Sequence, residues 1–167
     1  MRKLSQKIEL TANILIIVVA VLLVGVIVQK YFFPPKQPER MQPSVGTKVN
    51  LPEVNLSAQP KTLILVLQKD CHFCTESAAF YKRLLESTHD KNVKLVAVLP
   101  NTLEEGKAYL DKLGIANLEV KQSSMDNLQT SGTPTLILTN DKGEVTNFWI
   151  GKLPADKEQE VINQLIS

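Results

Sequence analysis

The first apolar segment of the chain is long enough to cross a membrane. Residues 14–28 read ILIIVVAVLLVGVIV, without a polar or charged side chain, and Ala12 and the aromatic cluster at 31–33 extend the segment to roughly 20 residues. A helix of about that length spans ~30 Å of hydrocarbon, and aromatic residues are typical of the membrane interface. The pattern therefore predicts a short cytoplasmic stub and a transmembrane helix within residues 1–33.

A cleavable signal peptide is the alternative interpretation of this segment. Arg2, Lys3 and Lys7 form a basic region before the apolar run, as they would in a signal peptide. The run is longer than the usual core of a signal peptide, and no A-x-A-like cleavage site follows it, which favours an uncleaved anchor. Basic residues flank the run on both sides, so the charge rule gives only a slight preference for a cytoplasmic N-terminus.

A change of composition separates the anchor from the rest of the chain. Residues 34–44 read PPKQPERMQPS, which is rich in proline and polar residues. This composition predicts a semi-extended spacer. Residues 45–167 follow it, and their number is enough for one domain with one hydrophobic core.

The first half of the domain reads as a βαβ unit. Residues 61–68 (KTLILVLQ) and 93–100 (VKLVAVLP) are continuous apolar runs, typical of central strands that are covered on both faces. Between them, residues 75–88 place Phe80 and Leu84 at the i, i+4 spacing of a helix. Strand, helix and strand predict a right-handed crossover.

A second helix follows the second strand. Thr102 and Glu105 have the spacing of a capping box, with threonine at the cap and glutamate three residues later. We expect this helix to run to Leu113 and to stop at Gly114.

The last part of the chain predicts a hairpin and a final helix. Residues 133–140 (TPTLILTN) and 144–151 (EVTNFWIG) flank a turn that contains Gly143, which is typical of antiparallel strands. Pro154 suits the first turn of a helix with one apolar face. The order βαβα and then ββα predicts an α/β domain, a mixed central sheet with helices on both faces.

The charge balance excludes one class of partner. The chain has 19 Lys and Arg and 17 Asp and Glu residues, a formal net charge of +2, and no long run of either sign. A protein that binds nucleic acid usually carries a basic patch or stripe. We therefore expect no nucleic-acid partner.

The candidate chemistry lies in residues 69–77, KDCHFCTES, which contain both cysteines of the chain. Cys71 follows a strand by a few residues, and Cys74 lies in the opening turn of the next helix. There, unpaired backbone N–H groups and the helix dipole favour a thiolate. Cys71 would be the attacking sulfur, and Cys74 would close a disulfide onto it as the resolving partner.

Side chains beside the nucleophile are candidates for tuning its redox poise, above all His72 and Phe73 between the cysteines. A protonated His72 would stabilise the Cys71 thiolate, as would Lys69, whereas Asp70 would oppose both. The net effect stays open at the level of sequence. His72 also has the simpler interpretation of an exposed loop residue.

Two non-redox interpretations of the cysteines compete with this one. A structural zinc site needs about four ligands, and beyond Cys71, Cys74 and His72 the chain has one more histidine, His89, at the far end of the predicted helix. We therefore expect neither a metal nor another cofactor. A pair of buried structural thiols stays open as an alternative.

These residues carry a family resemblance. LILVLQKDCHFC, followed at the usual distance by SGTPTLIL, resembles the thioredoxin superfamily. The leading segment VGTKVNLPEVNLS and the NDKGEV hairpin are similar to the membrane-anchored thiol-disulfide oxidoreductases of the TlpA/ResA type. The resemblance covers roughly residues 45–167 and implies a thioredoxin-like fold.

The resemblance also implies that Thr133 and Pro134 bind substrate, because Pro134 stands in the place of the family's cis-proline. A cis bond before it would place a backbone edge opposite the CxxC loop, where an extended substrate segment pairs like an added strand. The alternative is an ordinary proline that opens an edge strand.

The sequence departs from the family at two positions beside the cysteines. Asp70 stands where many thioredoxins have tryptophan, and Leu65 stands where they bury an acid that accepts the proton of the second thiol. Glu104, Glu105 or water would have to take over that role. For the two glutamates we expect capping and solvation instead.

The sequence thus predicts a thiol-disulfide oxidoreductase that is anchored in the cell membrane by a single span, with its domain on the extracytoplasmic side. Its expected partners are protein disulfides or dithiols and a membrane electron donor or acceptor, and its domain is expected to be monomeric. Whether it reduces or oxidises stays open. The alternative is a non-catalytic binding module with a structural disulfide, whereas a thiol peroxidase is disfavoured because its Thr-x-x-Cys motif is missing.

Overall fold

The computed structural model describes residues 2–32 and 41–167, and the side chains of residues 14–29 within the first range. The chain divides into two compact units near residue 40, which are described separately. Most of the spacer predicted for residues 34–44 lies outside the described residues.

The N-terminal unit contains one helix, α1 (Arg2–Phe32). Its large apolar side chains between Ile14 and Val28 are exposed. Within the described part of the chain, no helix meets the combined length and apolarity needed to span a membrane. The transmembrane helix is therefore not supported by the structure and stays a prediction.

The second unit is built on a mixed sheet of five strands in the order β3-β2-β1-β4-β5. The strands are β1 (Lys61–Val66), β2 (Val93–Leu99), β3 (Glu119–Gln122), β4 (Thr135–Asn140) and β5 (Val145–Ile150). β1, β2 and β3 are parallel, whereas β4 is antiparallel to β1 and to β5. The predicted βαβ unit and hairpin are both confirmed.

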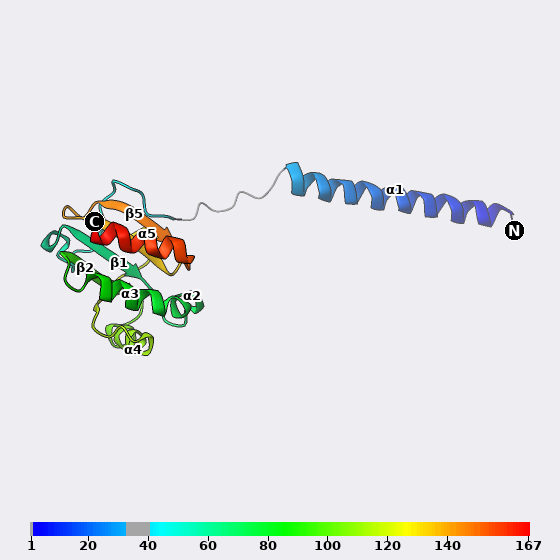
Figure 1. The fold of residues 1–167 in the computed structure, drawn as a ribbon. Coiled ribbons are helices and arrows are strands. Elements are labelled where there is room, and N and C mark those ends of the chain that lie inside the picture. The colour runs from blue at the N-terminus through cyan, green and yellow to red at the C-terminus, as the bar shows by residue number, and fades with distance from the viewer. Residues whose placement is uncertain (1, 33–40) are drawn as a thin grey trace. The chain divides into compact units, whose positions relative to one another are not determined.

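The four helices of this unit are α2 (His72–Glu76), α3 (Ala78–Thr88), α4 (Leu103–Leu113) and α5 (Ala155–Ile166). Side chains from all four pack in one apolar cluster against Leu63 and Leu65 of β1. Figure 1 shows α3 and α5 side by side on this face of the sheet. The sheet thus has one face covered by helices.

The opposite face is covered differently from the prediction. Ile64 and Val66 point to a second cluster, formed with Leu51 and Val54 from the segment before β1 and with Leu128 from a single 3₁₀ turn. The prediction of helices on both faces is therefore wrong for this face, which carries two 3₁₀ turns (Leu56–Ala58 and Asp126–Leu128) but no α-helix within the described residues. The reason is topological: two right-handed crossovers that step in the same direction, β1 to β2 and β2 to β3, place their helices on the same face.

The predicted ends of α4 are confirmed. Thr102 and Glu105 form a capping box, and the helix ends at Leu113 with Gly114 at a φ of 71°. The single helix predicted between the first two strands is instead divided into α2 and α3. The division lies at the buried Ser77, whose hydroxyl donates to the Phe73 carbonyl. A side chain that bonds back to the preceding turn often bends a helix.

The edge strand β3 was missing from the predicted order of elements. It is four residues long and only Val120 packs on the core, so its apolar signal is too weak to predict a strand. Glu119 pairs with Lys94 at 2.9 Å and with Lys121 at 3.3 Å. Charges on a short edge strand discourage pairing with other chains.

Residues 41–44, which the sequence placed in the spacer, are part of the second unit. The Met41 carbonyl accepts a hydrogen bond from the Ser131 N–H at 3.1 Å, and Pro43 is buried. Further on, Gly46 donates to the Val145 carbonyl at 2.8 Å. This leading segment therefore lies against the loop before β4 and against β5.

Candidate active site

The loop after β1 delivers Cys71 to the start of a helix, as predicted. Cys71 is the N-cap of α2, and its Sγ accepts a hydrogen bond from the Cys74 N–H at 3.1 Å. Asp70, the preceding residue, has a φ of 64°. Aspartate is among the few residues other than glycine that tolerate this left-handed conformation.

The two cysteines form a disulfide, with their Cα atoms 5.2 Å apart. Their environments differ: Cys71 is half-buried, whereas Cys74 is fully buried in the cluster under the helices. Of the two cysteines, only Cys71 keeps part of its surface exposed. The predicted roles, attack by Cys71 and resolution by Cys74, fit this asymmetry.

The loop before β4 lies against Cys71, although it is some sixty residues away in sequence. The Thr133–Pro134 peptide bond is cis, as the family resemblance implied, and the Thr133 carbonyl oxygen lies 3.5 Å from Cys71 Sγ. Pro134 is buried and its carbonyl accepts from the Gly151 N–H at 2.7 Å. The structure therefore brings together the four residues Cys71, Cys74, Thr133 and Pro134.

Two buried threonines hold this loop, and neither was among the residues expected at the site. Thr135 donates to the Gly132 carbonyl at 2.8 Å, and the Thr130 hydroxyl lies 3.2 Å from the same oxygen and 3.0 Å from Thr135 Oγ1. Both residues are fully buried. They fix the peptide next to Thr133. The available signal was a threonine on each side of SGTP.

The two residues between the cysteines both point to solvent. The His72 side chain is 78% exposed, and its Nε2 lies 3.2 Å from the Glu76 carboxylate. Glu76 also binds Lys152 at 3.0 Å, and this hydrogen bond is the main cause that lowers the pKa of Glu76. Phe73 is 53% exposed. The tuning roles of His72 and Phe73 stay predictions.

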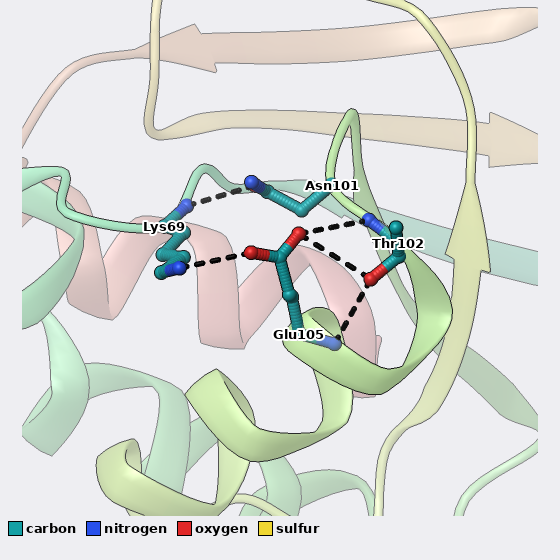
Figure 2. A network of polar contacts seen from close by, with 4 residues as sticks. All are labelled: Lys69, Asn101, Thr102 and Glu105. Atoms are coloured by element: carbon teal, nitrogen blue, oxygen red, sulfur yellow. Dashed lines mark hydrogen bonds and ion pairs between the residues drawn. The ribbon is translucent and has the colours of Figure 1, made fainter.

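A polar network stands beside the CxxC loop (Figure 2). Lys69 Nζ binds Glu105 Oε1 at 2.9 Å, and the Lys69 backbone N–H donates to Asn101 Oδ1 at 3.1 Å. The other carboxylate oxygen of Glu105 accepts from the Thr102 N–H at 3.4 Å. The Lys69 ammonium group, followed by the hydrogen bond from Thr102, holds the pKa of Glu105 below its usual value.

Neither Glu104 nor Glu105, both within the described residues, is placed as a substitute for the missing acid beside Cys74. Leu65 is fully buried in the same cluster as Cys74. Glu105 is occupied by Lys69 and Thr102, and Glu104 is exposed. Burial raises the pKa of Tyr81, a further member of that cluster, so its hydroxyl stays protonated at neutral pH.

Metal-ligating side chains do not gather anywhere in the described ranges, where no group of three or more His, Cys, Asp or Glu residues is found. His89 caps the far end of α3 and pairs with its neighbour Asp90 at 3.0 Å.

The fold of this chain is similar to that of solved protein structures. No protein-family model and no curated protein sequence matches the chain. The thioredoxin domain of a thiol-disulfide oxidoreductase from Bacteroides vulgatus superposes with a TM-score of 0.60 at 12% identity, over 75% of this chain and 100% of that one. The chain has a thioredoxin-like fold.

Other solved thioredoxin-like structures agree. StoA from Bacillus subtilis gives a TM-score of 0.52 at 20% identity and covers 72% of this chain and 97% of its own. A thiol-disulfide isomerase from Corynebacterium glutamicum gives 0.53 at 20% identity, over 79% of this chain and 97% of its own. At such identities the likeness shows the thioredoxin-like fold alone, and the chemistry rests on the residues described above.

Replacing Thr135 by valine tests the threonine pair that holds the loop before Pro134. The change keeps the shape of the side chain and removes a buried donor from the Gly132 carbonyl. We expect the free energy of unfolding to fall by about 1–3 kcal/mol, measured by urea denaturation. Thr62→Val is the control, because the Thr62 hydroxyl is also buried but has no hydrogen-bond partner among the described residues, and it should not lower the free energy of unfolding. Equal losses in the two variants would contradict this role.

Proposed function

We propose that this protein is a thiol-disulfide oxidoreductase that exchanges disulfides with protein substrates. The observation that carries the proposal is the unequal pair of cysteines: a half-buried Cys71 at the cap of α2, bonded to a fully buried Cys74. The thioredoxin-like fold and its known oxidoreductase members support it.

The first step is attack by the reduced Cys71 on a substrate disulfide. The Cys74 N–H, which donates to Cys71 Sγ at 3.1 Å, and the other free N–H groups of the first turn stabilise the thiolate. A bond forms between Cys71 and one substrate sulfur. The substrate S–S bond breaks, and its electron pair leaves with the other sulfur as a thiolate.

The second step is attack by Cys74 on the mixed disulfide. The Cys74 sulfur bonds to Cys71 Sγ, the bond between Cys71 and the substrate breaks, and the substrate sulfur that was attached to Cys71 leaves as a thiolate. The proton of Cys74 goes to water or to a departing substrate thiolate, since Leu65 offers no base. Two electrons have then passed from the cysteine pair to the substrate; the reverse sequence oxidises a dithiol.

The loop at Thr133 and Pro134 is the proposed substrate-binding edge. Thr133 places its carbonyl 3.5 Å from the sulfur that attacks, so a substrate strand beside this loop would hold its own sulfur close to Cys71. Extended peptides commonly bind an exposed backbone edge in this way.

We further propose that the apolar segment in α1 anchors the protein in the cell membrane, with the second unit on the extracytoplasmic side. The uninterrupted apolar run at residues 14–28 supports the anchor. The resemblance to the TlpA/ResA type supports the compartment, and it adds a membrane electron donor or acceptor that recycles the cysteines.

Single cysteine variants of the full-length chain test the exchange. Reduced Cys74→Ser, mixed with a disulfide-bonded peptide, should accumulate a covalent adduct that dithiothreitol releases, because Cys71 attacks and nothing resolves the product. Cys71→Ser should form no adduct and lose turnover. The adduct is measured by mass spectrometry.

The binding module with a structural disulfide is the second candidate, favoured by Leu65 in place of the family's acid. It predicts that neither variant forms an adduct and that partner binding survives both changes. That pattern would overturn the proposed oxidoreductase.

Charged substitutions in the apolar run test the anchor. Val19→Arg with Leu22→Arg should move the chain from the membrane fraction to the alkaline-extractable fraction, since an arginine at the centre of a span costs about 2.5–3.5 kcal/mol. The matched control, Val19→Leu with Leu22→Ile, should stay in the membrane. Wild-type protein that alkaline treatment extracts would contradict the anchor.

A further inference from the structure

The fold pairs the basic side chains beside Cys71 with carboxylates, and these pairs could not be predicted from the sequence. Lys69 precedes the nucleophile by two residues, and its ammonium group binds Glu105. His72 follows the nucleophile and contacts Glu76, which Lys152 also binds. Both groups able to stabilise the thiolate by positive charge thus face a carboxylate.

Asp70 has no such partner among residues 41–167, since its carboxylate enters no ion pair there. It lines a cleft of about 370 Å³ beside the CxxC loop, together with Lys69, Glu105 and Lys112. Around Cys71 the positive charge of Lys69 is therefore neutralised, while the negative charge of Asp70 is not neutralised by an ion pair.

We propose that Glu105 is a positioning residue that sets the redox poise of Cys71 by holding the Lys69 ammonium group away from the sulfur. The inference rests on the proposed function and deepens it, because it names a residue on α4 that tunes the site from outside the CxxC loop.

The Lys69 side chain is long enough to bring its ammonium group close to Cys71 when Glu105 does not hold it. Its Cα is two residues from that of Cys71, at most about 7 Å away, and its side chain is of similar length. The Lys69 side chain is 42% exposed, so packing leaves it room to reorient when its partner is removed. Residues that line the cleft also contact the backbone of Cys71. The Tyr109 hydroxyl donates to the Cys71 carbonyl at 3.5 Å and lies 3.2 Å from Thr75 Oγ1.

Glu105 is held in place independently of Lys69. Its backbone N–H donates to Thr102 Oγ1 at 3.3 Å, and its Oε2 accepts from the Thr102 N–H at 3.4 Å, the two bonds of a capping box. Asn101 anchors the backbone of Lys69 from the same loop (Figure 2). The start of α4 thus fixes the position of the carboxylate, and the carboxylate draws the lysine towards itself.

The consequence concerns the stability of the reduced pair. A cation close to Cys71 would stabilise its thiolate and so make the disulfide a stronger oxidant. With Lys69 held by Glu105 and with Asp70 adjacent, this stabilisation is withheld. The pairing of Lys69 with Glu105 therefore lowers the reduction potential of the CxxC couple, which makes the disulfide a weaker oxidant.

Glu105→Gln in the full-length chain tests the inference. Glutamine keeps the capping box but releases the lysine. At roughly 7 Å through water, one freed positive charge should raise the ratio of thiolate to thiol of reduced Cys71 about threefold, read from thiolate absorbance. Above the pKa of the thiol, the equilibrium constant for reduction should also rise about threefold, which is about 14 mV for a two-electron couple.

Glu104→Gln is the matched control. It removes the same charge from the same first turn of α4, but Glu104 forms no ion pair within the described residues. Its effect on the thiolate should be clearly smaller. In a Lys69→Met background, Glu105→Gln should show no more effect than Glu104→Gln, because no lysine is left to release.

Equal shifts in Glu105→Gln and Glu104→Gln would overturn the inference, as would a Glu105→Gln shift that persists without Lys69. The thiolate readout uses chemically reduced protein and needs no exchange partner. A specific Glu105→Gln shift in a chain that does not exchange disulfides would therefore overturn the proposed function alone. Normal exchange without the shift would overturn the inference alone.

Discussion

The buried strand β1 is the constraint on which the site depends. Residues 62–67 are fully buried, so the strand is fixed from both faces of the sheet. Its carboxyl end leads directly to Cys71, and its antiparallel register pairs Val66 with Thr135, the residue after Pro134. One strand therefore brings the CxxC loop and the Thr133 loop to the same edge of the sheet. The contact between Cys71 and Thr133 follows from that register rather than from any attraction between the two loops.

The chemistry of the site depends on unequal environments for two identical side chains. Cys71 lies at a helix start with its N–H groups and is partly exposed, whereas Cys74 is fully buried in an apolar cluster. A reaction in two steps needs this difference, because one sulfur must meet the substrate and the other must wait for the mixed disulfide. The surrounding ion pairs then modify the stability of the thiolate without changing the order of the steps.

Strong periodic patterns made much of the fold predictable. The apolar runs of β1 and β2, the capping box of Thr102 and Glu105 and the glycine turn at Gly143 all appear where the sequence placed them. The polar edge strand β3 and the single helical face did not follow, because the first lacks an apolar pattern and the second arises from the direction of two crossovers. At the site, motif spacing identified the cysteines and the proline loop. The partners of Lys69 and the buried threonines depend on tertiary contacts, which no local pattern encodes.

The most direct test of the account is the reduction potential of the cysteine pair in the full-length chain. The protein is equilibrated in glutathione or dithiothreitol redox buffers, and its free thiols are counted. The account predicts a reversible two-electron transition within about −120 to −270 mV, the range of known oxidoreductases. A disulfide that resists reduction below about −300 mV, or thiols that never pair, would contradict it.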